Sequence, residues 1–391
     1  MILFKYTINN FFKFLTTVLI LLSSSLNAGY TIKKKVGRQN TKLTLFGFSQ
    51  LEAKAGSGAK KTGQKADVKF GAQRVRIGFK YQAGAVRGKL FLDFAKSHTD
   101  KGGVGMPDMV KDAFITYYKN NAFAVKFGLI KMPHGMSFTI PGWNLDVVER
   151  GFDKKLALER NMGLMFSGRA IGSILGQKVN GYEMGHERPW RGFGYDIMIA
   201  NQAGRSGAVK GAKTGDSNSY AARIMYDAGE IFHTELSYGI SKYAGGLTSA
   251  NKEDYKSLNF GIDSHFGVSN LKFEMFDSKN IQGVKNWDEK TYSFTATRYV
   301  SNNLEFSLKH IYGKAKKAGV KTKLGNTFVG FNYYLSTPND KMTRMAKKNR
   351  NAHRVKLNYV ITCGDTTGSK TWNGLGGYKK NVWLLQYQYK F

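Results

Sequence analysis

The sequence contains very little cysteine and proline. Its 391 residues include one cysteine, Cys363, and five prolines. A single cysteine cannot form an internal disulfide, so an exported form of this chain must be held together by its fold alone. One short apolar run lies near the N-terminus, and no comparable run follows it. We therefore expect no anchor made of membrane-spanning helices in the rest of the chain.

Motifs for catalysis and for metal binding are also missing. The seven histidines show no metal-ligand spacing. Gly192-Phe193-Gly194 lies at the entry to an expected strand and not before a helix, so it does not indicate a nucleotide site. No Gly-x-Ser-x-Gly motif supports a hydrolase, although serine, histidine and aspartate are plentiful. We therefore expect no metal, no cofactor and no enzymatic activity, and a hydrolase is left as a third alternative.

The N-terminus has the pattern of a signal peptide. Lys5 and Lys13 supply positive charge, residues 14–22 form a short apolar core, and small residues follow, with cleavage expected after Ala28. The apolar core is too short for a convincing spanning helix. The pattern predicts that residues 1–28 are removed during export.

The C-terminus has the pattern of a strand with one apolar and one polar face. Residues 380–391 alternate in polarity and end on Phe391. Such a strand suits a barrel wall, where one face meets lipid and the other a wet lumen. A terminal aromatic of this kind resembles the signal that outer-membrane proteins present to their barrel assembly machinery. An ordinary edge strand is the alternative. The residues on the expected lipid face are Trp383, Leu385, Tyr387, Tyr389 and Phe391.

Alternation with a period of two predicts sixteen strands in all. Short connections alternate with long ones, among them a long link at 315–323, as in barrels of outer membranes. A soluble sandwich or solenoid is the alternative, but no fixed repeat supports it. We expect a loose periplasmic arm over 29–41 and one barrel domain over 42–391. The predicted strands are 42–52, 68–81, 85–96, 111–119, 122–131, 161–170, 191–200, 218–227, 231–242, 255–266, 270–279, 289–299, 304–314, 324–335, 352–361 and 380–391.

Acidic residues are scarce relative to basic ones. The chain has 60 Lys and Arg residues but only 27 Asp and Glu residues, which gives a net charge of +33. So large a charge repels itself and indicates a function. Nucleic acid is a frequent partner of basic proteins, but a signal peptide and a barrel pattern argue against it. A pathway for small anions fits this compartment better.

The strand pattern places most of the basic side chains on the inward faces. Lys or Arg in the middle of a bilayer costs about 2–4 kcal/mol, so location alone does not prove selectivity. The excess of one sign is more informative, because rings of Arg and Lys make anion pores. The alternative is a general porin whose cations are paired with acidic residues of the wall. The expected anion pathway comprises Arg74, Arg76, Lys80, Lys89, Lys126, Lys131, Arg169, Arg223, Lys272, Lys309, Arg354 and Lys356.

The longest connection, 132–160, follows the fifth predicted strand. It contains Phe138, Trp143 and two prolines, and an external loop with this apolar content should fold against another surface. The lumen wall is the nearest such surface, so the segment is expected to be a constriction loop. Its candidate residues are Trp143, Glu149, Arg150, Lys154, Lys155 and Arg160.

Four segments in order along the chain resemble the phosphate-selective porins O and P. The resemblance implies a sixteen-stranded barrel, usually trimeric, with the third loop in the lumen and cationic residues guiding anions. The segments are Gln73-Arg74-Val75-Arg76-Ile77-Gly78, Asp112-Ala113-Phe114-Ile115-Thr116-Tyr117, Lys126 to Pro133, and Asp146-Val147-Val148-Glu149-Arg150 followed by Arg160-Asn161-Met162-Gly163.

Together these patterns predict an all-β protein, a sixteen-stranded antiparallel transmembrane barrel with an inward-folded third loop. We expect it in the outer membrane of a Gram-negative bacterium, as a homotrimer in contact with lipid and lipopolysaccharide. Its predicted function is passive diffusion of phosphate or related anions. A general porin is one alternative. Another is a structural or adhesive barrel whose basic loops, such as Lys60-Lys61, bind polyanions.

Overall fold

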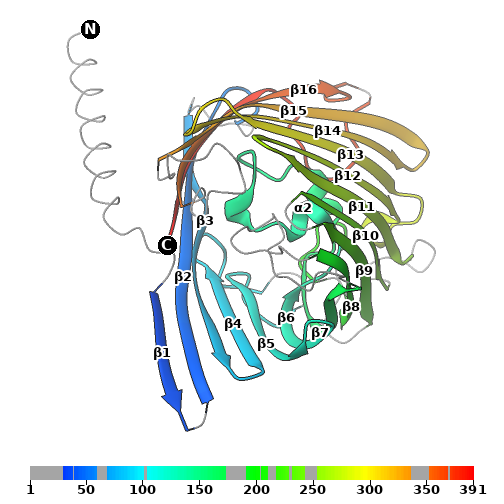
Figure 1. Cartoon of the computed structure of the whole chain (residues 1–391). Coiled ribbons are helices and arrows are strands. Elements are labelled where there is room, and N and C mark those ends of the chain that lie inside the picture. Colours follow the sequence, from blue (N-terminus) through cyan, green and yellow to red (C-terminus); the bar gives the residue numbers. More distant parts are fainter. Residues whose placement is uncertain are drawn as a thin grey trace.

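The computed structural model forms a closed antiparallel barrel of sixteen strands (Figure 1). It describes residues 30–37, 39–59, 68–100, 104–172, 191–202, 204–209, 217–228, 231–242, 253–335, 352–368 and 370–391. The predicted signal peptide, 1–28, and the pair Lys60-Lys61 lie outside these residues. So do most of 171–190 and all of 336–351, two connections that are longer than the short turns expected between their strands. None of the described helices is long and apolar enough to cross a membrane.

Each strand of the barrel pairs with the next along the chain, and β17 pairs with β2 to close the sheet. Closure leaves no long unpaired edge in the wall, which a lipid environment would not tolerate. All sixteen predicted strands are confirmed. They are β2 Gln39–Ala55, β3 Val68–Ala83, β4 Val86–Asp93, β5 Val110–Asn120, β6 Phe123–Lys131, β7 Arg160–Ile171, β8 Arg191–Asn201, β9 Asn218–Ala228, β10 Phe232–Ser241, β11 Tyr255–Phe266, β12 Ser269–Lys279, β13 Asp288–Tyr299, β14 Leu304–Lys317, β15 Val320–Tyr334, β16 His353–Gly364 and β17 Val382–Lys390.

The two faces of the wall follow the sequence alternation. In β9, Tyr220, Ile224 and Tyr226 are exposed on the outside, whereas Arg223 is buried on the inside. In β17, Trp383 is 49% exposed, whereas Gln386 is fully buried. Apolar residues outside and polar residues inside are what a barrel in lipid requires, because its backbone is satisfied within the sheet.

The segment 29–41 is not a loose arm. Tyr30–Val36 forms an additional strand, β1, that pairs with the first residues of β2. β17 pairs with Phe48–Ala55 of β2, and Phe391 exchanges backbone hydrogen bonds with Gly47 at 3.0 and 3.1 Å, so β17 does not reach the first residues of β2. β1 takes that edge instead, which satisfies the backbone groups that would otherwise be unpaired.

The link predicted at 315–323 is also different from expectation. β14 and β15 continue through this region and are joined by only Ala318 and Gly319. Both residues have positive φ angles, 47° and 83°, which is the geometry of a tight hairpin turn. The lysines of this segment therefore lie on long strands rather than on a loop.

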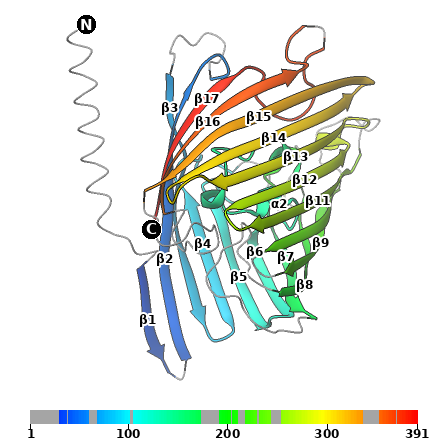
Figure 2. The same cartoon turned by 45° about the horizontal axis from the view of Figure 1, so that its top comes forward.

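The segment between β6 and β7 lies inside the ring of strands (Figure 1). It contains the short helix α2, Met136–Thr139, and two 3-10 turns, Gly142–Asn144 and Asp153–Leu156. Figure 2 shows the same segment from a second direction, enclosed by the strands. Its course through the lumen positions the candidate site.

Candidate functional site

The segment 132–159, called the lumen loop below, packs mainly against the inward face of β10–β17. Its residue Phe138 joins a buried cluster with Phe276 of β12, and Val148 joins another with Ile311 of β14. Its backbone is held as well, since the amide nitrogen of Val148 donates to the side chain of Asn358 at 2.8 Å. Apolar burial and hydrogen bonds thus hold the lumen loop to one side of the barrel.

His134 ties the beginning of the lumen loop to its end. Its Nε2 is 3.1 Å from the carbonyl oxygen of Ser257 in β11, and its Nδ1 accepts a hydrogen bond of 3.1 Å from the amide of Leu158. These two contacts require a neutral ring with the proton on Nε2. Burial lowers the pKa of His134 from 6.5 to about 4, so the ring is neutral at pH 7.

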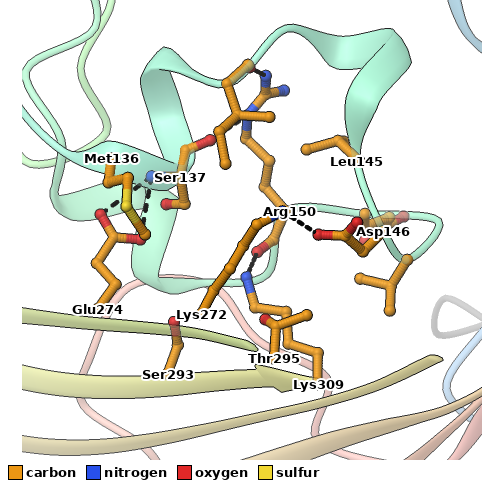
Figure 3. Close-up of a pocket in the computed structure, with 13 residues that line it drawn as sticks. Met136, Ser137, Leu145, Asp146, Arg150, Lys272, Glu274, Ser293, Thr295 and Lys309 are labelled. Carbon is orange, nitrogen blue, oxygen red and sulfur yellow. Dashed lines mark hydrogen bonds and ion pairs between the residues drawn. The ribbon is translucent and has the colours of Figure 1, made fainter. Parts of the chain in front are cut away.

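On β12, β14 and β16, four of the predicted pathway cations contact the lumen loop. Lys272 pairs with Asp146 at 2.5 Å and Lys309 donates to the backbone oxygen of Arg150 (Figure 3). Arg354 donates to the carbonyl of Trp143 at 2.6 Å, and Lys356 to that of Val147 at 3.2 Å. We call the β11–β16 side, with Lys272, Lys309, Arg354 and Lys356, the loop-bound wall.

Little space is left between the lumen loop and the loop-bound wall. The cavity drawn in Figure 3 is about 30 Å³ and is lined by Lys272, Glu274 and Lys309 together with loop residues. Glu274 receives the amide hydrogen of Ser137 at 3.1 Å, which closes the gap further. A cavity of this size holds about one water molecule, so it is not a passage for hydrated ions.

A larger cavity lies on the other side of the lumen loop, against β3–β9. Its volume is about 140 Å³, and Pro141, Gly142 and Trp143 form its loop side. Two carboxylates, Asp112 and Asp196, also line it. We call this side of the barrel the open wall. The cationic residues lining the cavity are Arg76, Lys89, Lys126, Lys131, Arg160 and Arg223.

The two carboxylates of the open wall each hold two cations. Asp112 is 2.8 Å from Lys89 and 3.0 Å from Arg160. Asp196 is 2.6 Å from Arg169 and 2.5 Å from Arg223. Glu235 also pairs with Arg223, at 3.0 Å, so two carboxylates balance the Arg169 and Arg223 pair. Asp112 alone serves Lys89 and Arg160, and this leaves positive charge in excess at the cavity, which attracts anions.

Other contacts fix the remaining cations around the cavity. Arg76 pairs with Asp93 at 2.9 Å, behind the cavity surface. Lys131 donates to the loop carbonyl of Thr139 at 3.2 Å, and the described residues give it no ion pair. Arg74, buried nearby, donates to the side chains of Gln50 and Gln73. Neutral oxygens, and no ion-paired carboxylate among the described residues, therefore hold Lys131 and Arg74.

A second cavity, of about 480 Å³, continues toward the end of the barrel that carries the short connections. It shares Lys89, Phe114 and Lys126 with the first cavity, so the two are contiguous. No acidic residue lines it among the described residues. Its cationic lining residues are Lys42, Lys80, Arg87, Lys89, Lys126 and Arg169.

Trp143 occupies a central place among the predicted loop residues. Its ring packs edge-on against Phe48, with 5.2 Å between centroids, and also lies near Phe91. The ammonium of Lys390 is 5.1 Å from the same ring. Sequence alternation leaves the faces of Phe46 and Phe48 ambiguous, and the structure turns both inward to meet this ring.

The charged loop residues have separate contacts. Glu149 pairs with Lys54 at 2.5 Å, and Arg150 donates to the carbonyl of Ser137 at 2.9 Å. Burial, followed by the nearby positive charges of Arg74, Arg76 and Arg160, lowers the pKa of Arg150. This direction reflects the concentration of positive charge between the lumen loop and the open wall.

The end of the lumen loop carries one more ion pair. Lys154 lies 2.9 Å from Glu159. Burial opposes the charge of Glu159, but Lys154 and Arg160 outweigh it and lower the pKa of Glu159 to about 2. The neighbouring Lys155 is exposed and lies beside Gly207 and Gly376, away from both cavities.

Sequence reasoning missed some residues of the cavities. Arg87 has the same strand parity as Lys89, so the alternation already indicated its inward position. Lys42 lies where the arm was expected to end. The apolar inward residues Phe276 and Ile311 were also missed, and they are the signal that a segment of chain covers them.

The comparisons with known proteins agree with this geometry. Residues 50–267 match the sequence model of the family described as phosphate-selective porin O and P. An anion-selective porin from Comamonas acidovorans has 14% identity and a TM-score of 0.58, covering 90% of this chain and 100% of that one. OmpT of Vibrio cholerae has 12% identity and a TM-score of 0.58, covering 93% and 100%.

OmpF of Salmonella typhi, solved with daunomycin, has 12% identity and a TM-score of 0.59, covering 90% of this chain and 98% of that one. Identities this low show a shared fold alone. No curated protein sequence matches the chain.

Proposed function

Because the chain belongs to the phosphate-selective porin O and P family, we propose that it is an outer-membrane porin for small anions. The observation that carries the proposal is the pair of contiguous cavities along the open wall. Ten Lys and Arg side chains line them, against two carboxylates among the described residues. Such an excess of one sign selects ions by charge.

The geometry supports a two-stage passage. An anion that enters the narrower cavity loses part of its water, and ammonium and guanidinium hydrogens replace that water. Arg160 and Arg223 are fixed by carboxylates and offer directed donors, whereas Lys131 and Lys126 act as compact point charges. The wider cavity, with no acidic lining residue, then draws the anion onward.

The lumen loop sets the width of this passage in our proposal. It fills the loop-bound side and leaves the 140 Å³ cavity on the other side, with Trp143 at its margin. We further propose that the protein resides in the outer membrane of a Gram-negative bacterium as a homotrimer. The long connections then face outward, and Phe391 serves the barrel assembly machinery.

The test is electrical. The purified protein is reconstituted in a planar bilayer, the reversal potential is measured in a KCl gradient, and phosphate is then titrated in. Chloride selectivity with block by low phosphate supports a phosphate-preferring pore, and selectivity without block supports a general anion porin. Cation selectivity, or the absence of conductance, overturns the assignment of the open wall.

A further inference from the structure

The outer surface of β11–β15 carries a group of lysines that the pore does not use. All of them are exposed, and strand alternation places them opposite in direction to the buried residues of the lumen. They lie near the first residues of β11, β13 and β15 and near the last residues of β12 and β14. These five strands form one continuous side of the barrel (Figure 2). We call this group the lysine belt; it comprises Lys256, Lys279, Lys290, Lys314, Lys316, Lys321 and Lys323.

Within the belt, like charges face one another across the strands. Lys256 is the register partner of Lys279, and Lys316 is that of Lys321. Lys314 lies between Lys290 and Lys323 in a row across three strands. Like charges directly opposite destabilise a sheet. The belt contains four such pairs, and their repulsion is relieved when an anion lies over them.

Three acidic residues lie in or beside the belt and offset part of its charge. Asp277 pairs with Lys290 at 2.6 Å, and Asp288 is the register partner of Lys316. The carboxylate of Asp365 accepts the backbone amide of Lys323 at 2.8 Å. Seven lysines against three aspartates leave the belt positive.

The belt has a defined height on the wall. Tyr292 and Tyr312 are register partners. They lie two residues from Lys290 and Lys314 along the same strands, on the side toward the short-connection end of the barrel. The apolar residues Phe294 and Leu308 follow further along the strands. Aromatic residues mark the boundary between headgroups and acyl chains, so the lysines lie at headgroup level.

We propose that the lysine belt binds glycolipids of the outer leaflet through the phosphate groups of their headgroups. A phosphate over Lys290, Lys314 and Lys323 meets three ammonium groups on strands about 4.8 Å apart, while its acyl chains lie against the apolar band. A free anion would gain the contact with the ammonium groups but not the contact with the apolar band. The lysines also take the place of divalent cations that would otherwise bridge lipid phosphates.

Lipid binding by the belt does not depend on which ion passes through the pore, because the belt and the cavities lie on opposite faces of the wall. It rests on the proposed function only for the location of the protein in the outer membrane. A loss of lipid binding therefore leaves ion selectivity unchanged, and a failure of the anion pathway leaves lipid binding unchanged.

The test compares wild type with K290Q/K314Q/K323Q by native mass spectrometry in detergent. The probes are bisphosphorylated lipid A and its fully dephosphorylated form, both with EDTA present. The matched control is K33Q/K34Q/K35Q on β1, which removes the same charge at the short-connection end. A folded variant migrates differently on gels before and after boiling, and its single-channel conductance equals that of wild type.

We expect wild type and the β1 control to bind bisphosphorylated lipid A equally, and the belt variant to bind it about tenfold or more weakly. The dephosphorylated form should bind weakly to all three proteins. Equal binding by wild type and the folded belt variant overturns the proposal. So does displacement of the lipid by millimolar inorganic phosphate, because the belt is then a site for free anions.

Discussion

The two walls of the lumen carry the same kind of residue but use it differently. On the loop-bound wall, Lys272, Lys309, Arg354 and Lys356 hold the lumen loop and leave a cavity of about 30 Å³. On the open wall, cations such as Lys131 and Arg223 face cavities of about 140 and 480 Å³. An inward-facing cation is thus a structural contact on one side and a candidate ion contact on the other.

The ion-pair partners of the cations explain why the two walls differ. Lys272 meets Asp146 of the lumen loop, with both side chains less than 10% exposed, so its charge is neutralised locally. On the open wall, Asp112 is shared between two cations, Lys89 and Arg160. A wall keeps net positive charge only where its cations outnumber the acidic residues that pair with them. This net charge decides which wall attracts anions.

The largest effect is expected from breaking the loop-bound wall. K272M/K309M leaves Asp146 and Asp153 buried without their cations, and breaking a buried ion pair costs about 3–5 kcal/mol. The lumen loop should detach, which raises single-channel conductance and current noise and exposes the loop to limited proteolysis. Adding Asp146→Asn should restore part of the wild-type conductance, since it removes one of the two carboxylates that lost their cations and leaves only Asp153. An unchanged conductance in K272M/K309M contradicts the loop-bound assignment.

Acid is expected to loosen the same contacts more mildly. His134 has a pKa of about 4 when the lumen loop is bound to the wall, compared with an ordinary value of 6.5. Between pH 4 and pH 6.5 the released loop therefore binds more protons than the bound loop does. The free energy that holds the lumen loop to the wall is therefore greatest above pH 6.5. It decreases as the pH falls from 6.5 to 4, and it does not change further below pH 4. The total change is on the order of 3 kcal/mol. Channel noise recorded from pH 7 to pH 4 should rise in wild type, and the rise should be absent in His134→Gln. A rise of equal size in both proteins excludes His134 as the group responsible.

Changes on the open wall should alter selectivity while the lumen loop stays attached to the loop-bound wall. K126Q/K131Q removes two charges that line the cavity, each worth about 1 kcal/mol at 4 Å in water. We expect the ratio of anion to cation permeability to fall about tenfold. Reversal potentials in a KCl gradient measure this, with K33Q/K35Q on β1 as the control of equal charge. If the control shifts the potential as much, net charge and not the cavity sets selectivity.

The smallest effect is expected at the half-exposed end of the lumen loop. Lys154 and Glu159 have side chains 24% and 21% exposed, so water screens this pair more than it screens Lys272 with Asp146, and both residues lie on the lumen loop itself. Glu159→Gln should leave single-channel conductance and loop proteolysis at pH 7 close to wild type. A large increase in either would show that this pair, like Lys272 with Asp146, holds the loop.

Much of the fold could be predicted because a strand in a barrel wall has only two faces. The alternation in 218–227 and 380–391 assigns each side chain to lipid or lumen, and the structure agrees. The pattern could not reveal the hairpin at Ala318 and Gly319, because polar residues continue through both strands there. Nor could it reveal β1, whose role depends on where Phe391 leaves the edge of β2 open.

The sequence by itself determined the barrel, its strand order and the inward direction of its cations, because these depend on local alternation and chain connectivity. Only the tertiary structure decided which cations meet the lumen loop and which meet a cavity. That division depends on contacts between residues more than a hundred positions apart, such as Lys272 with Asp146. Alternation along a strand carries no information about such contacts, since it fixes the face of a residue but not what lies opposite that face.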